Sequence, residues 1–283
     1  MTLSRFAKLT AFATFCLLIA GGLVTSTNSG LAVPDWPLSY GTLFPPMVGG
    51  VRFEHTHRVI AGLVAILIAV LAFWLRRSEP RPWVRQLGMA ALGAVIAQAL
   101  LGGLTVLLLL PPMVSVAHAC LAQTVFCLVV SVALVTSSMW QRADEPIVDA
   151  DRLRRITRAL TAIVFVQLLL GAIIRHSGLG IPWHIAGAVV VSIMAIVAVK
   201  RAKRSGSRRL FRAGLILAHA IAAQIILGPL ILIIGRYPLL TTAHVAVGAS
   251  TLATACVMAW LAWRAQPAEV ATLSTEKLAG QPA

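Results

Sequence analysis

Four histidines occupy equivalent places in this chain, each near the start of a long apolar run: His57, His118, His184 and His244. Imidazole is a common metal ligand, and two imidazoles that face each other across a helical bundle suit the two axial positions of a haem iron. Zinc fits less well, because two histidines per half leave a tetrahedral ion short of ligands and no cysteine or carboxylate pair completes the set. A single histidine at this depth is more often a buried hydrogen-bonding group, but four at matching places favour ligands.

The segment EHTHR, from Glu54 to Arg58, places an acid beside one of these histidines. Glu54 and His57 are three residues apart and share a helix face, whereas no acid precedes His184 in the second half. This asymmetry predicts that the chemistry takes place in the first half, with Glu54, His57 and His118 as catalytic residues and Arg58 in contact with the bound cofactor. The alternative is that Glu54 forms an exposed or half-buried ion pair with Arg58, four residues later.

The remaining polar residues of the apolar runs are expected to have lesser roles. Gln98 and Gln224 recur in the two halves, but a buried glutamine more often bonds a neighbouring helix than a ligand. We interpret the other histidines as structural or peripheral, with one of them in a loop: His55, His176 (the loop residue) and His219. None of the four cysteines forms a CxxC motif or lies in an outer loop, so no disulfide chemistry is expected.

The composition is that of a membrane protein. Hydrophobic residues make up 59% of the 283 residues and charged residues 12%, against roughly 45–50% and 25% in soluble domains. Eight apolar runs approach the roughly 20 residues that cross a bilayer. Because lipid requires continuous backbone hydrogen bonding and no alternating pattern is present, we predict an all-α fold with eight transmembrane helices. The predicted spans are 11–27, 59–75, 87–110, 113–135, 159–174, 183–199, 211–234 and 241–262.

The basic residues predict the orientation of these helices. Of the 24 Lys and Arg, 20 fall on one side, and cytoplasmic loops hold such an excess. Both termini should therefore be cytoplasmic, with the four histidines toward the outer face. The net charge of +15 thus reports topology, and no basic stretch interleaved with aromatic residues indicates a nucleic-acid partner. Residues 1–27 are expected to stay as a helix, because no small-x-small cleavage site follows them.

An internal repeat divides the chain into two halves. Ala97–His118 matches Ala223–His244 at eight of 22 positions without a gap, and NSGLAVP at Asn28–Pro34 matches HSGLGIP at His176–Pro182. Both halves enter from the cytoplasm, so the repeat is parallel and unlike the inverted repeats of many transporters. We therefore expect two tandem four-helix bundles.

The predicted domain boundaries follow from the repeat and from the polar segments. Residues 1–140 form the first half, 141–156 a cytoplasmic linker, 157–264 the second half, and 265–283 a disordered cytoplasmic tail. The first half has about 22 additional residues on its outer side, including DWPLSYGTLFPPMVGG.

Two motifs resemble the heme A synthase family: TSTNSGLAVPDWPLSYG at Thr25–Gly41 and EHTHRVIAG at Glu54–Gly62. The resemblance extends over about residues 1–264 and implies oxidation of a ring methyl of heme O to a formyl group, through an alcohol, giving heme A for cytochrome oxidase. It also implies a resident heme B on His184 and His244, and heme O as substrate at His57 and His118 with Glu54 essential. Many bacterial members have a cysteine pair in the first outer loop, but Leu31–Phe53 contains none, so that disulfide is not carried over.

The sequence thus predicts a haem-modifying oxidoreductase of the bacterial plasma membrane. Expected partners are heme O and membrane lipid, with heme O synthase, an electron acceptor such as a quinone, and a second copy of the chain as further candidates. The alternative is a diheme b-type cytochrome that relays electrons from quinol without modifying haem. Both use four histidines, but only the enzyme requires Glu54 and a site open to exchange.

Overall fold

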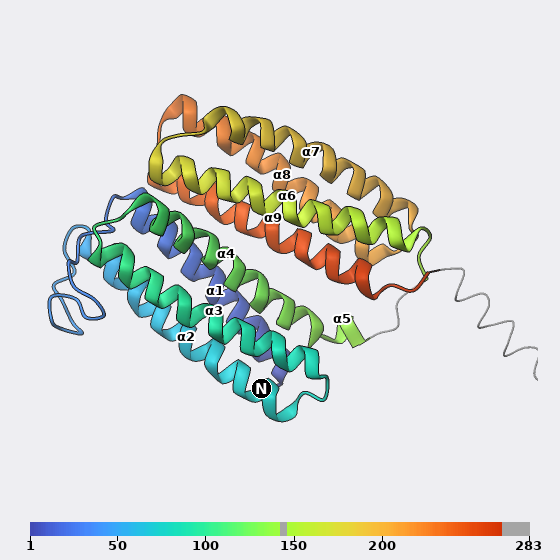
Figure 1. The fold of residues 1–283 in the computed structure, drawn as a ribbon, viewed down its shortest axis with the longest axis horizontal. Helices are drawn as coiled ribbons and strands as arrows, with labels where there is room; N and C mark the ends of the chain where they lie inside the picture. Colours follow the sequence, from blue (N-terminus) through green and yellow to red (C-terminus); the bar gives the residue numbers. More distant parts are fainter. Residues whose placement is uncertain (142–145, 268–283) are drawn as a thin grey trace, which may run out of the picture.

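The computed structural model describes residues 1–141 and 146–267, and its long elements are all helices (Figure 1). Eight helices are long and apolar enough to cross a membrane, which confirms the predicted all-α integral membrane protein. They are α1 (Leu3–Ser26), α2 (Val51–Ser78), α3 (Pro82–Leu107), α4 (Pro112–Val135), α6 (Ala150–Ser177), α7 (Ile181–Arg204), α8 (Arg208–Ile234) and α9 (Pro238–Arg264). A single helical turn, α5 (Ser138–Gln141), follows α4.

Most of the helices extend beyond the predicted apolar spans, although α3 ends at Leu107, three residues before the predicted end of its span at 110. Helix α2 begins at Val51, eight residues before the predicted start, so that Glu54 and His57 lie within its first two turns. At its other end the helix includes Arg76 and Arg77. Hydropathy detects only the part of a helix that is immersed in hydrocarbon, whereas backbone hydrogen bonding continues into the interface, where arginine side chains reach water.

Prolines and glycines determine several helix ends. Four helices have a proline in the first turn, where the missing N–H group would have no partner in any case; these are α3, α4, α7 and α9. Helix α6 ends at Gly178, whose φ of 75° is left-handed and is readily adopted by glycine. These prolines and this glycine therefore mark helix ends in the sequence.

Each group of four long helices forms a closed ring of contacts (Figure 1). Helix α1 contacts α2 and α4, and α3 contacts both α2 and α4; α6, α7, α8 and α9 contact one another in the same cyclic order. The two groups meet through α4, α9, α1 and α6. Small residues such as Ala249 and Ala253 of α9 pack there against Leu18 and Phe126, as is usual where membrane helices approach closely.

The segments predicted as linker and tail are described in part. Residues 142–145, in the predicted linker, and residues 268–283, which are most of the predicted disordered tail, lie outside the described residues. Helix α6 already begins at Ala150, and Ile147 donates its N–H to the carbonyl of Gln266 at 2.9 Å. The chain that enters α6 therefore lies beside the chain that leaves α9.

Candidate functional site

All four predicted ligand histidines lie at one end of the molecule. This end, where α1, α3, α6 and α8 finish and α2, α4, α7 and α9 begin, is called the histidine end below. Each of the four side chains is in the first two turns of its helix and is partly exposed. The Nδ1 atom of each is nevertheless buried and has no hydrogen-bond partner; the four are His57, His118, His184 and His244.

The missing partners argue against a role for these histidines as ordinary buried hydrogen-bonding groups. A buried polar atom without a partner costs about 1–3 kcal/mol, so its presence requires an explanation. A single such atom would carry little weight, but the same atom is without a partner at four equivalent positions. The four imidazoles therefore fit a group that binds imidazole, such as the iron of a haem.

Each imidazole packs on a glycine of the preceding helix. A Cβ atom built on that glycine would lie 3.0 to 3.6 Å from the Cε1 atom of the ring. At three of the four positions the distance is 3.0–3.1 Å, so a larger residue would crowd the imidazole there, whereas the 3.6 Å at Gly228 is an ordinary contact. The contacts are Gly21 with His57, Gly102 with His118, Gly171 with His184, and Gly228 with His244. The sequence analysis did not find them, although Gly102 and Gly228 are among the matched positions of the repeat.

In the second half, the two imidazoles face each other. The ring centres of His184 and His244 are 6.4 Å apart, with an interplanar angle of 63°. Imidazole–metal bonds are about 2 Å long, so two rings on opposite sides of one ion have centres about 6 Å apart. The spacing of this pair is therefore compatible with one metal ion held between the rings.

Three glutamines, each on the helix before a histidine, lie within hydrogen-bond distance of that histidine. Gln167 and Gln224 donate through Nε2 to the backbone carbonyls of His184 and His244, each at 2.9 Å. Helix-to-helix bonding is thus the role of Gln224. In the first half, Nε2 of Gln98 lies 3.3 Å from Nε2 of His118, so this glutamine contacts the ring itself. Gln167 was not found from the sequence, because its position in the first half is not a glutamine.

Glu54 is buried, with 3% of its surface exposed. One carboxylate oxygen accepts the N–H of Val33 at 2.8 Å, and the other accepts Nη2 of Arg58 at 2.5 Å. The expected i, i+4 pair with Arg58 is therefore present, with the carboxylate buried and the guanidinium half-buried, at side-chain exposures of 4% and 14%. Breaking a buried pair by removing one partner costs several kcal/mol, far more than the loss of a surface pair.

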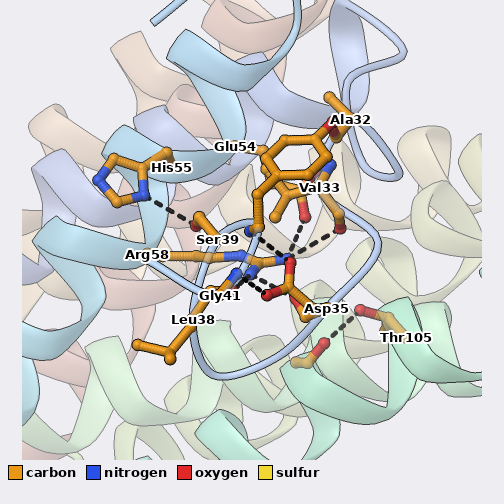
Figure 2. Close-up of polar contacts among 12 residues, drawn as sticks. Ala32, Val33, Asp35, Leu38, Ser39, Gly41, Glu54, His55, Arg58 and Thr105 are labelled. Carbon is orange, nitrogen blue, oxygen red and sulfur yellow. Dashed lines mark hydrogen bonds and ion pairs between the residues drawn. The ribbon is translucent and has the colours of Figure 1, made fainter. Parts of the chain in front are cut away.

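Arg58 joins this carboxylate to the first loop, residues 27–50, which connects α1 to α2 (Figure 2). Its Nη1 donates to the carbonyl oxygens of Asp35 and Leu38, each at 2.6 Å, and its Nη2 also donates to that of Val33 at 3.2 Å. Three carbonyls and one carboxylate thus converge on a single guanidinium. Glu54 and Arg58 together hold the loop against α2.

The loop also has internal bonds and a contact with α3. The Asp35 carboxylate accepts the N–H groups of Gly41 at 2.8 Å and Tyr40 at 2.7 Å (Figure 2). These bonds, that of Gly41 foremost, lower the pKa of Asp35 below its usual 3.8. The indole of Trp36 packs so closely on Gly103 that a Cβ there would lie 2.7 Å from it. Gly103 adjoins Gly102, the contact of the His118 ring, so the loop lies beside the first-half histidine site.

The structure also places the histidines that were considered peripheral. His55 bonds Ser39 through Nδ1 at 2.9 Å and so contributes to holding the loop. The prediction that His176 lies in a loop is wrong, because α6 continues through it to its glycine cap. His219 is in α8, with Nδ1 2.7 Å from the carbonyl of Leu215. Among the residues that the structure describes, no three His, Cys, Asp or Glu side chains cluster as a metal site, and the four cysteines are free.

Parts of this chain are similar in sequence to known proteins. Residues 51–186 match the family model of the cytochrome oxidase assembly protein, a segment that includes Glu54, His57, His118 and His184. Curated relatives include the heme A synthase of Lysinibacillus sphaericus, 30% identical over 179 residues, covering 62% of this chain and 58% of that protein. That of Exiguobacterium sibiricum is 28% identical over 182 residues, covering 62% and 60%.

A shorter and more similar stretch is shared with the heme A synthase of Shouchella clausii, 36% identical over 104 residues, or 35% of this chain and 34% of that protein. The matches thus span at most about three fifths of the length of these relatives. Residues 51–186 of this chain are thus similar to the cytochrome oxidase assembly protein family, and the curated proteins that resemble the chain are heme A synthases.

Proposed function

We propose that this protein is a heme A synthase, which oxidises a ring methyl of heme O to a formyl group through an alcohol. The observation that supports this most directly is the asymmetry of the two histidine pairs. Only the pair His57 and His118 has a buried acid, Glu54, and an ordered loop beside it. A protein that only relays electrons between two equivalent haems has no need of this difference, whereas an enzyme that modifies one haem does.

We assign a resident heme B to the C-terminal half, residues 157–264. His184 and His244 would hold it, as their 6.4 Å spacing and unpartnered Nδ1 atoms support. When bound, this group supplies one-electron transfer. The contacts of the rings with Gly171 and Gly228, and the bonds of Gln167 and Gln224 to the histidine backbones, fix the donors in place.

We assign the substrate site to residues 1–140, with His57 and His118 as ligands of the iron of heme O. Glu54 is the essential acid of this half. Both of its oxygens are already bonded, to Val33 and Arg58, which supports a role in positioning the loop. A direct effect of the carboxylate charge on the reacting methyl carbon is the competing role, and the variants in the Discussion separate the two.

The remaining assignments follow from the charges. With 20 of 24 basic residues on the other side, the histidine end would face outward, and both termini and the linker around 141–156 would be cytoplasmic. We place the protein in a bacterial plasma membrane. Heme O synthase is the proposed supplier of substrate and a quinone the proposed acceptor of the electrons removed from the methyl group.

Haem analysis of single histidine variants tests the assignment of the halves. His184→Ala or His244→Ala should remove most bound heme B, because a six-coordinate iron loses an axial ligand. His57→Ala and His118→Ala are the matched controls, which should retain heme B and lose heme A production in cells that supply heme O. Equal loss of heme B from all four variants, with no heme O or heme A in the purified protein, would instead indicate the diheme relay.

A further inference from the structure

The second half has an unusual distribution of charge. Between Asp151 and the end of α9 at Arg264 the sequence contains no Asp or Glu. Two arginines nevertheless lie at the histidine end of this half: Arg175 in the last turn of α6, and Arg236 in the turn between α8 and α9. None of the ion pairs in the described part of the chain includes either of them.

These two arginines lie next to each other. Nη2 of Arg236 is 3.5 Å from the backbone carbonyl of Arg175. Nη2 of Arg175 donates to Ser26 Oγ at 2.7 Å and to the carbonyl of Gly22 at 3.3 Å, which directs the side chain between α6 and α1. The Nε and Nη1 groups of Arg175 have no hydrogen-bond acceptor among the residues that the structure describes.

The pair also lies close to the proposed heme B site. Arg175 follows Gly171 by four residues, one turn of helix, and therefore shares its face of α6. Gly171 is the contact of the His184 ring. Arg175 is also near enough to His244 for its charge to act on that imidazole. Arg175 thus lies about one turn beyond the contact of the His184 ring, and Arg236 lies beside Arg175.

Arg175 is half-buried and Arg236 is exposed. Two adjacent cations repel each other, and an anionic partner offsets both this repulsion and the partial burial of the Arg175 charge. The guanidinium fork matches the geometry of a carboxylate, which it binds through two parallel hydrogen bonds. In the first half, Glu54 supplies such a carboxylate to Arg58 at 2.5 Å. The second half has no acid of its own, so the anion has to come from a ligand.

We infer that Arg175 and Arg236 form an anion site for the two propionate carboxylates of the heme B in the C-terminal half. The inference rests on the proposed function, because it requires a haem between His184 and His244. Two carboxylates on one edge of the macrocycle match two guanidinium groups at one end of the ring ligands. A phospholipid phosphate offers similar chemistry, but the position of Arg175 one turn from the His184 contact favours the propionates.

Haem reconstitution tests this site directly. The full-length protein, freed of haem and placed in phosphatidylcholine nanodiscs, is titrated with iron protoporphyrin IX and with its dimethyl ester, which lacks both negative charges. Hydrogen bonds to charged groups predict roughly tenfold to hundredfold weaker binding of the ester. Arg236→Gln should remove most of this preference and shift the reduction potential of the bound haem to more negative values. Arg52→Gln, at an exposed arginine of the same end in the first half, is the matched control and should retain the preference.

The possible outcomes separate this inference from the proposed function. Arg175→Gln should act as Arg236→Gln does, but because Arg175 also bonds α1, the Arg236 variant decides. Equal binding of acid and ester by the wild-type protein, with both abolished in His184→Ala, would overturn the propionate site and leave the heme B site standing. A full preference for the acid in Arg236→Gln would likewise overturn it. If the variant instead changes only the response to added phosphatidylglycerol, the arginines bind lipid. Haem binding that is unaffected by His184→Ala would refute the proposed function itself.

Discussion

Replacement of Gly171 by alanine tests whether the glycine contacts position the haem ligands. The new Cβ would lie 3.1 Å from Cε1 of His184, whereas carbon atoms in good contact are about 3.5–4.0 Å apart. The ring must therefore move by roughly 0.4–0.9 Å, while metal–ligand distances tolerate only about 0.2 Å. Overpacking of this kind costs about 1–3 kcal/mol, which corresponds to roughly 5- to 150-fold weaker haem binding.

Gly228→Ala is the matched control for this prediction. It changes the equivalent residue beneath His244, but its Cβ would lie at an ordinary contact distance of 3.6 Å, so it should bind heme B almost normally. The assay is heme B content after purification, followed by titration of the haem-free protein. Alanine stabilises a helix relative to glycine by about 1 kcal/mol, so loss of haem from Gly171→Ala would not reflect a weaker helix. Equal affinities of the two variants would refute the role of these contacts.

Three further predictions concern the first loop and the topology. Glu54→Gln leaves Arg58 without its buried carboxylate, so the heme A yield should fall by a factor of about 10²–10³ while heme B is retained. If the pair positions the loop, the heme A yield of Arg58→Gln should fall by a comparable factor. A normal heme A yield from Arg58→Gln would show that the Glu54 charge acts directly. Because the pKa of Asp35 is lowered, its bonds to the loop stabilise the folded state above pH 3.8 and are lost as the pH falls through the lowered value. Protection of the Gly41 amide from exchange, relative to its intrinsic rate at the same pH, should therefore be present at neutral pH and be lost only in strong acid. Asp35→Asn should have less protection at neutral pH, and equal protection in both proteins contradicts this. A reporter fused after residue 264 should be cytoplasmic and one inserted near Gly49 external, and the reverse pattern would overturn the proposed orientation.

The helices and the histidines were predictable from the sequence because each rests on a local rule. Lipid requires helical spans of about 20 residues, and hydropathy detects them. The gap-free match of His118 to His244 predicted two ligands at once. Most helix ends were predicted too short, since hydropathy does not follow a helix such as α2 into the interface.

The contacts of the site were not predictable, because they depend on tertiary structure. The bonds of Arg58 to the carbonyls of Asp35 and Leu38 require the fold of a loop that has no periodic pattern. The contact of Gly21 with His57 is not marked by the repeat, whose offset changes between the two helices. Burial of Glu54 likewise depends on where that loop lies, so the sequence left open whether its pair with Arg58 is exposed or half-buried.

The contacts between the two halves have the pattern of a twofold-symmetric dimer. Suppose that α1 corresponds to α6 and α4 to α9. Rotation by half a turn then exchanges α4 with α9, which leaves their contact unchanged, and it converts the α1–α9 contact into the α6–α4 contact. All three of these contacts are present. Such an interface is isologous, as in a dimer of identical four-helix chains related by an axis along the membrane normal. The polar contact of Arg175 with Ser26 departs from this symmetry. Gly21 and Gly171 occupy equivalent places beneath their histidines, and four residues further on stand Thr25 and Arg175. In a dimer of identical chains two arginines would face each other across the axis, whereas the fused chain, free to differ between its halves, has only one.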